Sequence, residues 1–243
     1  MSVQFLWRAY KTRFRDQRAE IRELISAIKP GEIAVDVGSH KGSYLYWLAK
    51  AAAPGQVVAF EPQPTLAEYL RRECAAARLK NVVVESAGVS DHNGELTLHV
   101  PGTSTSHGAS FEDIVLSIRK CQSFSVPVYK LDDYFRNRTS RIAALKIDVE
   151  GHEFSVLRGA QELLRRDAPC LVVECEARRL TTCSVQDVLS YLQSLGFSGS
   201  FVDQGRLRPV SEFDPTKHQR MKGDRFWDAP DYCGNFVLTR NVA

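Results

Sequence analysis

The sequence lacks the features of a membrane-spanning or secreted protein. No segment reaches the roughly 18–20 apolar residues that a transmembrane helix needs. The N-terminus has neither the apolar run nor the small-residue cleavage site of a signal peptide. The 6 cysteines form no CxxC pair and no Cys/His spacing typical of zinc sites, which favours buried free thiols. We therefore expect an intracellular, cytoplasmic protein.

The sequence also lacks a large net charge. The 32 Lys and Arg residues exceed the 29 Asp and Glu residues by only three, too few to indicate a nucleic-acid-binding protein. Hydrophobic residues make up 44% of the chain and charged residues 25%, which is ordinary for a globular protein and excludes a disordered one. A length of 243 residues favours one domain with short appendages.

The most uneven charge lies in residues 1–30, which hold seven Lys or Arg and three Asp or Glu. Apolar residues recur there at steps of three, four and seven, which predicts an amphipathic helix, interrupted near Gln17 and ended by Pro30-Gly31. We expect this segment to pack on a domain formed by residues 31–243. A membrane-surface or substrate-lid role is the alternative.

Strand and helix patterns alternate through the rest of the chain, which predicts right-handed βαβ units and a parallel sheet. Residues 91–130 interrupt this alternation of strands and helices. They predict an insertion of two strands with a loop rich in Pro, Gly and Ser. The predicted strands span 33–37, 57–60, 82–84, 143–149, 170–175, 197–202 and 235–239, and the helices span 42–53, 66–79, 153–166 and 185–195.

The first strand runs into VDVGSHKG, where Gly38 and Gly42 permit a tight turn and close approach of a ligand to the backbone. The spacing is G-x-x-x-G and not the G-x-G-x-x-G of dinucleotide sites. The second strand ends in AFEP, so Glu61 lies at its carboxyl end, where an acidic side chain can accept hydrogen bonds from ribose hydroxyls.

Asp36 bears on the choice of cofactor. It precedes the glycine turn, where a carboxylate repels the pyrophosphate of NAD but attracts an amino group. S-adenosylmethionine carries an ammonium, a sulfonium and a ribose but no phosphate. Asp36 and Glu61 together therefore favour S-adenosylmethionine over NAD.

Acidic side chains gather at two later strand ends. Asp148 and Glu150 are two apart, as are Glu174 and Glu176, so each pair shares one face if the strand is regular. These four carboxylates are suited to hold Mg²⁺ or to bind the hydroxyls of a sugar, and the sequence does not separate the two. Next to the first pair, His152 and Glu153 open the following helix.

Several segments together resemble the FkbM family of S-adenosylmethionine-dependent methyltransferases. They are VDVGSHKG, AFEP, NVVVESAGVSDHNGELTL, VPVYKLDDYF and LKIDVEGHEFSVLRGAQELL, and they span roughly residues 33–176. The resemblance implies an α/β class I methyltransferase fold: a Rossmann-like three-layer sandwich with a mostly parallel seven-stranded sheet whose last strand is antiparallel. It also implies methylation of a hydroxyl, on a sugar, glycan or natural product.

The resemblance also implies roles for single residues. The loop at the methionine end of the cofactor would be formed by Asp36, Gly38, Ser39, His40 and Gly42. Glu61 would bind the ribose with Pro62 beside it, and Ser86, Ala87 and Gly88 would border the adenine. Asp148 and Glu150 would face the methyl group and the acceptor.

Methyl transfer to a hydroxyl also requires a proton acceptor. We hypothesise that His152 or Asp148 is the general base and that Glu150 orients it or the acceptor. The expected partner is a small-molecule or glycan acceptor, with no nucleic acid. Three alternatives stay open: an NAD-dependent oxidoreductase, an RNA methyltransferase that uses the basic N-terminal segment, and a catalytically silent binding module.

Overall fold

Short apolar runs form the centre of the main sheet. In the computed structural model, which describes residues 2–102, 105–118, 120–223 and 225–240, β1 (Ile33–Val37) lies between β2 (Val57–Phe60) and β7 (Ile142–Ile147). Every residue of these three strands is buried, because helices cover both faces of the sheet. The predicted bounds of the first two strands are confirmed.

The main sheet has the order β10-β9-β11-β8-β7-β1-β2-β3. β1, β2, β7 and their neighbours β3 and β8 run parallel, whereas β11 lies antiparallel between β8 and β9. The mostly parallel sheet with an antiparallel last strand is thus confirmed. The remaining strands are β3 (Val82–Glu85), β8 (Cys170–Glu174), β9 (Ser198–Asp203), β10 (Arg206–Pro209) and β11 (Asn235–Thr239).

The sheet has eight strands and not the predicted seven. The additional strand, β10, pairs antiparallel with β9 through a tight turn at Gln204 and Gly205, whose φ angles are 48° and 74°. Its four residues, RLRP, contain one apolar side chain other than proline, so no hydrophobic pattern marks them as a strand.

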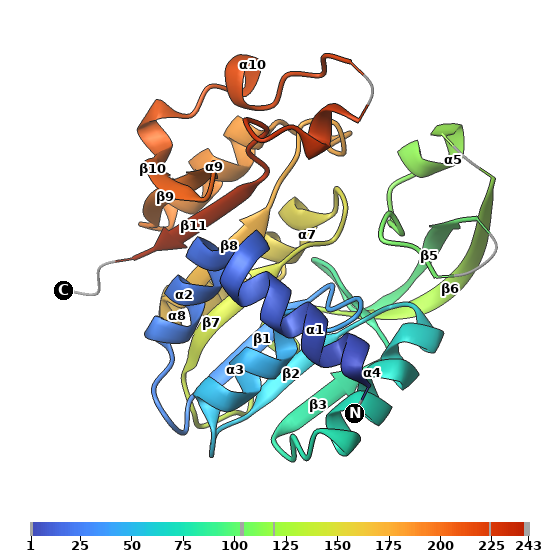
Figure 1. Cartoon of the computed structure of the whole chain (residues 1–243), viewed down its shortest axis with the longest axis vertical. Coiled ribbons are helices and arrows are strands. Elements are labelled where there is room, and N and C mark those ends of the chain that lie inside the picture. The colour runs from blue at the N-terminus through green and yellow to red at the C-terminus, as the bar shows by residue number, and fades with distance from the viewer. Residues whose placement is uncertain (1, 103–104, 119, 224, 241–243) are drawn as a thin grey trace.

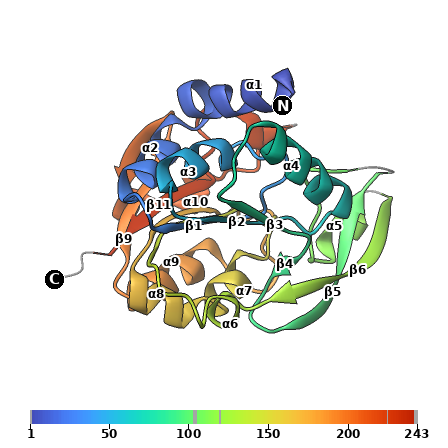
Figure 2. The ribbon, with the colours of Figure 1, turned by 90° about the horizontal axis from the view of Figure 1, so that it is seen from below.

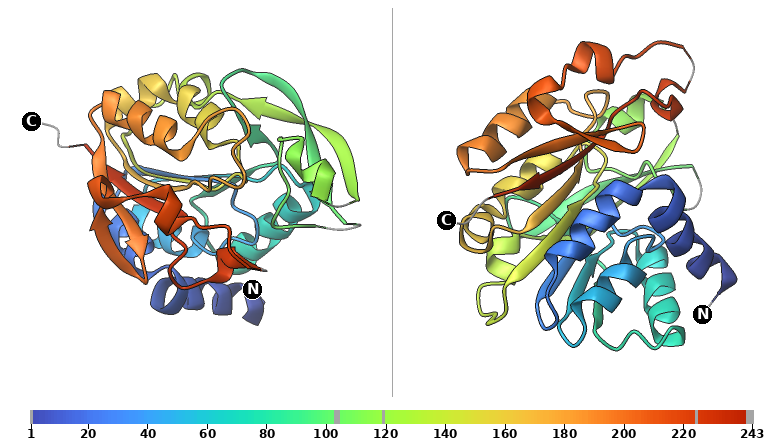
Figure 3. Two further views of the ribbon diagram at one scale, coloured as in Figure 1. Left: turned by 90° about the horizontal axis from the view of Figure 1, so that it is seen from above. Right: turned by 60° about the vertical axis from the view of Figure 1, so that its left-hand side comes forward.

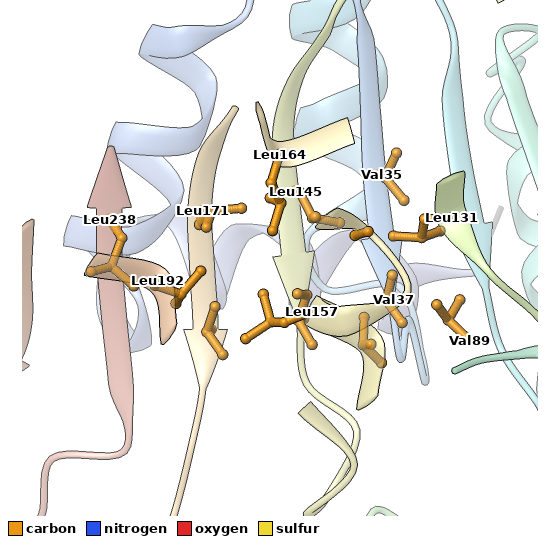
Figure 4. Packing of buried hydrophobic residues seen from close by; sticks show 14 of the residues in the cluster. Val35, Val37, Val89, Leu131, Leu145, Leu157, Leu164, Leu171, Leu192 and Leu238 are labelled. Atoms are coloured by element: carbon orange, nitrogen blue, oxygen red, sulfur yellow. The ribbon is translucent and has the colours of Figure 1, made fainter. Parts of the chain in front are cut away.

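Helices cover both faces of the sheet, as Figure 2 shows. One layer holds α2 (Arg18–Ala27), α3 (Leu45–Ala52) and α4 (Pro64–Ala76). The other holds α6 (Leu131–Tyr134), α7 (Glu153–Arg158), α8 (Gln161–Asp167) and α9 (Val185–Ser194). In the second layer, strand residues such as Leu145 and Leu171 pack against helix residues such as Leu157 and Leu192 (Figure 4).

The N-terminal helix is interrupted where the sequence predicts it. α1 (Val3–Lys11) continues through a π-helical turn (Thr12–Asp16), and Gln17, with φ −132° and ψ 48°, separates that turn from α2. α1 lies on the outer side of the helical layer, where Trp47 Nε1 of α3 donates a hydrogen bond of 2.7 Å to the carbonyl of Ala9 (Figure 2).

The helix predicted over residues 153–166 is divided into α7 and α8. Gly159 separates them and approaches the backbone so closely that an added Cβ would lie 2.0 Å from the carbonyl oxygen of Ser90. The Asp132 carboxylate accepts hydrogen bonds from the backbone N–H groups of Glu162 and Leu163, which starts α8 anew. These partners come from distant sequence, so local propensity does not reveal the break.

A second, three-stranded sheet stands beside the main one (Figure 1). It pairs β4 (Gly88–Val89) with β6 (Cys121–Tyr129), and β6 with β5 (Gly94–Pro101). The segment between β5 and β6 carries α5 (Ile114–Ile118) and returns to β5, where His99 and Ser110 exchange backbone hydrogen bonds. The end of the chain adds a short helix, α10 (Pro215–His218), as Figure 3 also shows.

Candidate functional site

A cavity of about 230 Å³ lies at the carboxyl ends of β1, β2, β7 and β8. Ligands of open α/β sheets bind at this edge. Eight of the predicted site residues line the cavity: Gly38, His40, Glu61, Pro62, Ala87, Gly88, Asp148 and Glu150. Five lie outside its lining: Asp36, Ser39, Gly42, Ser86 and His152. The segment between β5 and β6 closes the cavity from the other side with residues Ser106 to Phe111.

The turn after β1 requires glycine at its first position. Gly38 has φ +77°, and an added Cβ would lie 1.8 Å from the carbonyl oxygen of Asp148. The backbone N–H groups of Gly38 and Ser39 donate to the carbonyl of Phe60, which fixes the turn against the end of β2. Gly42 instead serves packing, since a Cβ there would lie within 3 Å of the Leu70 and Phe5 side chains.

Asp36 lies beneath this turn, almost fully buried, and meets a lysine that the sequence analysis missed. Lys146 Nζ lies 3.5 Å from Asp36 Oδ1 and 3.1 Å from Asp148 Oδ2, and donates a 2.9 Å hydrogen bond to the carbonyl of Gly38. Burial raises the pKa of Asp36, and the nearby ammonium opposes that rise. The expected contact of Asp36 with a ligand amino group stays a prediction. A lysine inside the apolar run AALKI was the available signal.

Glu61 is held by the backbone. Its Oε2 accepts a 2.7 Å hydrogen bond from the N–H of His40, and its Oε1 accepts a 2.9 Å bond from the N–H of Gln63. Burial raises its pKa to about 7, although both hydrogen bonds favour the ionised form. The carboxylate therefore has one fixed orientation at the cavity wall, with lone pairs left for a ligand hydroxyl.

The β5–β6 segment is fastened to the cofactor side of the cavity by contacts that the sequence analysis did not foresee. Gln63 exchanges hydrogen bonds of 2.9 and 3.0 Å with the backbone of Ser106. The rings of His40 and His107 are in contact, with centroids 3.7 Å apart and planes inclined by 42°. Burial lowers the pKa of His40 to about 3 and also lowers that of His107, so the two rings are neutral at pH 7.

The segment after β3 forms the part of the cavity wall next to Glu61, whose backbone N–H donates to the carbonyl of Glu85 at the end of β3. Ala87 and Gly88 line the cavity, and Ser86 does not. A Cβ on Gly88 would lie 2.5 Å from the ring of Phe111, so glycine at this position lets that aromatic ring reach the wall. Phe111 was also missed, because nothing in the local sequence indicates that it folds over this strand end.

The carboxylates at the ends of β7 and β8 converge differently from the prediction. β7 ends at Ile147 and Glu150 has φ +55°, so the shared-face argument for Asp148 and Glu150 was wrong, although both line the cavity. Glu150 Oε2 lies 2.8 Å from Arg179 Nε, and burial raises the pKa of Glu150 to about 8. Glu174 also lines the cavity, and the charge of Asp148 together with burial raises its pKa.

Glu176 lies next to that group: it shares a small adjoining pocket with Asp148, Glu150 and Glu174, and its charge contributes to the raised pKa of Glu150 and Glu174. β8 ends at Glu174, and the Glu176 carboxylate forms an ion pair of 2.5 Å with Arg178 outside the lining of the main cavity. Within the part of the chain that the structure describes, no group of three or more His, Cys, Asp or Glu side chains has an arrangement that could hold a metal ion. The same described residues contain no helix long and apolar enough to cross a bilayer.

His152 uses both ring nitrogens in contacts within the protein. Its Nε2 lies 3.0 Å from Ser90 Oγ and its Nδ1 lies 2.9 Å from Glu112 Oε1, which comes from the β5–β6 segment. Glu153, the first residue of α7, accepts a 3.0 Å hydrogen bond from the N–H of Gly151. The general-base role of His152 stays a prediction, but in this structure the ring joins the second sheet to the main domain.

The sequence is similar to those of known methyltransferases. Methyltransferase sdnD of Sordaria araneosa is 28% identical over 189 residues, which cover 67% of this chain and 70% of that protein. The 2-O-methyltransferase NoeI of Sinorhizobium fredii is 26% identical, over 60% of this chain and 64% of that protein. Methyltransferase 1 of Beauveria bassiana is 24% identical, and the match spans only 58% of its length.

Solved structures agree on the fold. A Streptococcus mutans protein crystallised in complex with SAH superimposes with a TM-score of 0.51 at 13% identity, over 92% of this chain and 96% of that one. This likeness shows a class I methyltransferase architecture. The family model for the methyltransferase FkbM domain matches residues 36–198, well over half of the chain. The chain therefore belongs to the FkbM family of methyltransferases, whose cofactor is S-adenosylmethionine.

Proposed function

We propose that this protein transfers a methyl group from S-adenosylmethionine to a hydroxyl oxygen of a small molecule or glycan. The observation that carries the proposal is the row of carboxylates, Asp148, Glu150 and Glu174, that faces the Glu61 side across one cavity. Carboxylates accept hydrogen bonds from hydroxyl groups and can accept a hydroxyl proton. The name of NoeI, a 2-O-methyltransferase, supports the same chemistry.

The residues of the cavity fit S-adenosylmethionine. Glu61 is positioned to accept hydrogen bonds from the ribose hydroxyls, and the turn at Gly38 lines the cavity where the methionine end would lie. Ala87 and Gly88, with only a methyl group between them as side chain, leave room at the cavity wall for a flat base. A dinucleotide is disfavoured, because its pyrophosphate would enter a cavity lined by four carboxyl groups. This argues against the oxidoreductase alternative.

When bound, the cofactor supplies a methyl group already activated by the sulfonium charge, so this chain's residues have to align the acceptor and receive its proton. Arg179 holds Glu150, and Lys146 holds Asp148, so neither carboxylate is free to turn away. Alignment of the reacting groups contributes roughly 7–11 kcal/mol in favourable cases. We assign Glu150 to contact the acceptor hydroxyl and, when ionised, to accept its proton, with Asp148 and Glu174 binding neighbouring hydroxyls.

We assign His152 a positioning role. Its contacts with Ser90 and Glu112 hold the β5–β6 segment over the cavity, and Ser110 Oγ of that segment donates a 2.7 Å hydrogen bond to the carbonyl of Glu150. His152 therefore acts on Glu150 through the segment and not by contact with the acceptor.

The test has two stages. Calorimetric titration with S-adenosylmethionine, S-adenosylhomocysteine and NAD should show binding of the two sulfur compounds, lost in Glu61→Ala and kept in the control Glu95→Ala on β5. Transfer of isotope-labelled methyl groups to sugar and natural-product hydroxyls should then be detected, with the methylated atom located by mass spectrometry. Binding of NAD alone would overturn the assignment of the cofactor. Methyl transfer only to RNA or to a nitrogen atom would overturn the assignment of a hydroxyl acceptor.

A further inference from the structure

The outer face of α1 carries an uninterrupted apolar stripe. Val3, Trp7, Tyr10 and Phe14 recur at steps of four, three and four, so they lie on one side of the helix. They are 84%, 57%, 55% and 48% exposed. The opposite side of the same helix, with Phe5 and Ala9, is buried against the domain. α1 is therefore apolar on two faces, and only one of them is covered.

The rings of this stripe pack on one another. Trp7 stacks on Tyr10 with centroids 6.1 Å apart, Tyr10 contacts Phe14 at 4.8 Å, and Phe14 meets Trp47 of α3 edge-on at 5.8 Å. A continuous exposed apolar surface of this kind marks an interaction site.

A basic groove continues from the end of the stripe. It has a volume of about 770 Å³ and lies between the start of α2 and the β9–β10 turn. Five arginines line it, Arg13, Arg15, Arg18, Arg22 and Arg206, against a single carboxylate, that of Asp16. Phe14 lines the groove as well as ending the stripe, so the two features form one surface.

Three of the five groove arginines form no ion pair with a described residue, whereas Arg15 pairs with Asp16 and Arg22 pairs with Glu23 at 3.0 Å. Asp16 is shared between Arg15 and Lys11, at 2.8 and 3.2 Å. Arg18 and Arg206 form no ion pair with any residue that the structure describes, and both are exposed. A two-fold contact with a second copy of the chain would set these like charges against each other, which disfavours self-association through this face.

We propose that this surface, defined by Val3, Trp7, Tyr10, Phe14 and the five groove arginines, docks the protein onto an anionic lipid bilayer. Aromatic side chains with one polar end settle at the bilayer interface, and each basic residue near an anionic leaflet adds to the affinity. Figure 3 shows α1 at the periphery of the molecule, where such a surface is accessible. The proposal is independent of the methyl acceptor.

The docking surface adjoins the cavity. Gln17, the residue that interrupts the N-terminal helix, lines the cavity, while its neighbours Asp16 and Arg18 line the groove. The interruption of the helix thus connects the two sites. Docking would therefore place the cavity close to the bilayer surface.

The experiment is flotation of the full chain with vesicles of phosphatidylcholine alone and of phosphatidylcholine with phosphatidylglycerol. Binding should occur with the anionic vesicles and weaken with salt. Arg15→Glu/Arg18→Glu should reduce the partition coefficient at least tenfold, on the order of one basic residue's contribution per position. The control Arg72→Glu/Arg136→Glu makes the same change in net charge on other exposed surface and should change it less than about twofold.

The apolar stripe is tested by Trp7→Ser/Tyr10→Ser, which should weaken vesicle binding at least about tenfold. Melting temperature and titration with S-adenosylhomocysteine should be unchanged in all three double variants, since none of the substituted side chains lines the cavity. No binding to anionic vesicles, or an equal loss in the arginine control, would overturn the proposal. Binding of single-stranded RNA in place of vesicles, or a dimer dissolved by Trp7→Ser, would assign the surface to those partners instead.

Discussion

The two sides of the cavity hold their carboxyl groups in opposite ways. On the cofactor side, Glu61 accepts two backbone hydrogen bonds, from His40 and Gln63, at the end of a regular strand. On the acceptor side, Glu150 and Glu174 lie near Asp148, whose charge contributes to the raised pKa of both. The Glu150 carboxylate forms an ion pair with the Arg179 side chain. Its backbone, with φ +55°, lies beyond the end of β7 and is not extended.

The difference indicates a division of labour. Backbone donors keep Glu61 in one place whatever its surroundings, which suits recognition of an invariant ribose. On the other side, burial and the charge of Asp148 raise the pKa of Glu150 to about 8, and the charge of Asp148 and burial also raise the pKa of Glu174. Burial gives Glu61 a pKa of about 7 as well, so the acid–base role assigned to Glu150 rests on its place beside Asp148 on the acceptor side of the cavity. Four predictions test this comparison.

The largest effect should come from Glu61→Ala. Loss of charged hydrogen bonds to two ribose hydroxyls, each worth about 1.5–3 kcal/mol, should weaken S-adenosylhomocysteine binding at least about 100-fold. The free His40 and Gln63 N–H groups should also lower the melting temperature. Calorimetry measures the first and thermal denaturation the second. An affinity within twofold of the wild type would remove Glu61 from the cofactor site.

The next effect should come from Glu150→Gln. The substitution keeps the shape but removes the proton acceptor, so turnover should fall roughly 100-fold, while S-adenosylhomocysteine affinity should stay within about threefold. Single-turnover transfer of labelled methyl groups gives the rate. A matched loss of cofactor affinity would contradict the division between the two sides.

The pH dependence should show two separate limbs. The Glu61 carboxylate, with a raised pKa of about 7, is protonated as the pH falls through 7, so S-adenosylhomocysteine affinity should decrease below that pH. The Glu150 carboxylate, with a pKa of about 8, ionises only as the pH rises, so turnover should increase up to about pH 8 and level off. In Glu150→Gln the second limb should vanish and the first remain. Identical profiles for the two proteins would refute the assignment.

The smallest effect should come from His152→Gln, which we expect to reduce turnover about tenfold or less and leave cofactor affinity intact. Glu112→Gln removes the charged partner of the His152 Nδ1 atom and should reduce turnover by a similar factor. The double variant should lose little further turnover, because both substitutions remove the same contact. Turnover in the wild type, the two single variants and the double variant gives the double-mutant cycle. A far larger loss in His152→Gln alone would favour the histidine as the general base itself.

Much of the fold can be predicted from the sequence, because buried strands and amphipathic helices each have a characteristic pattern of hydrophobic residues along the chain. The runs at β1, β2 and β11, and the interruption at Gln17, were all visible in this way. β10 and the break between α7 and α8 were not, since a neighbouring strand and the distant Asp132 decide them.

The site was partly predictable for the same reason. Gly38 and Glu61 follow apolar strands directly, so their positions at the sheet edge can be deduced from the chain alone. His107 and Phe111 lie in a loop without a repeating pattern, and only the folding of β5 and β6 back over the sheet brings them to the cavity. Lys146 stood in the sequence as a lysine in an apolar strand, but its two carboxylate partners come from different strand ends.

By itself, the sequence determined the order of strands and helices, the glycine turn and the acidic residue that follows the second strand, because these depend on neighbours a few residues apart. Only the tertiary structure decided which side chains share the cavity. It buried Asp36 against Lys146, turned Glu150 out of its strand and tied His152 to Glu112. Such pairings join residues far apart in the chain, and burial then sets their charge and orientation in ways that no local pattern records.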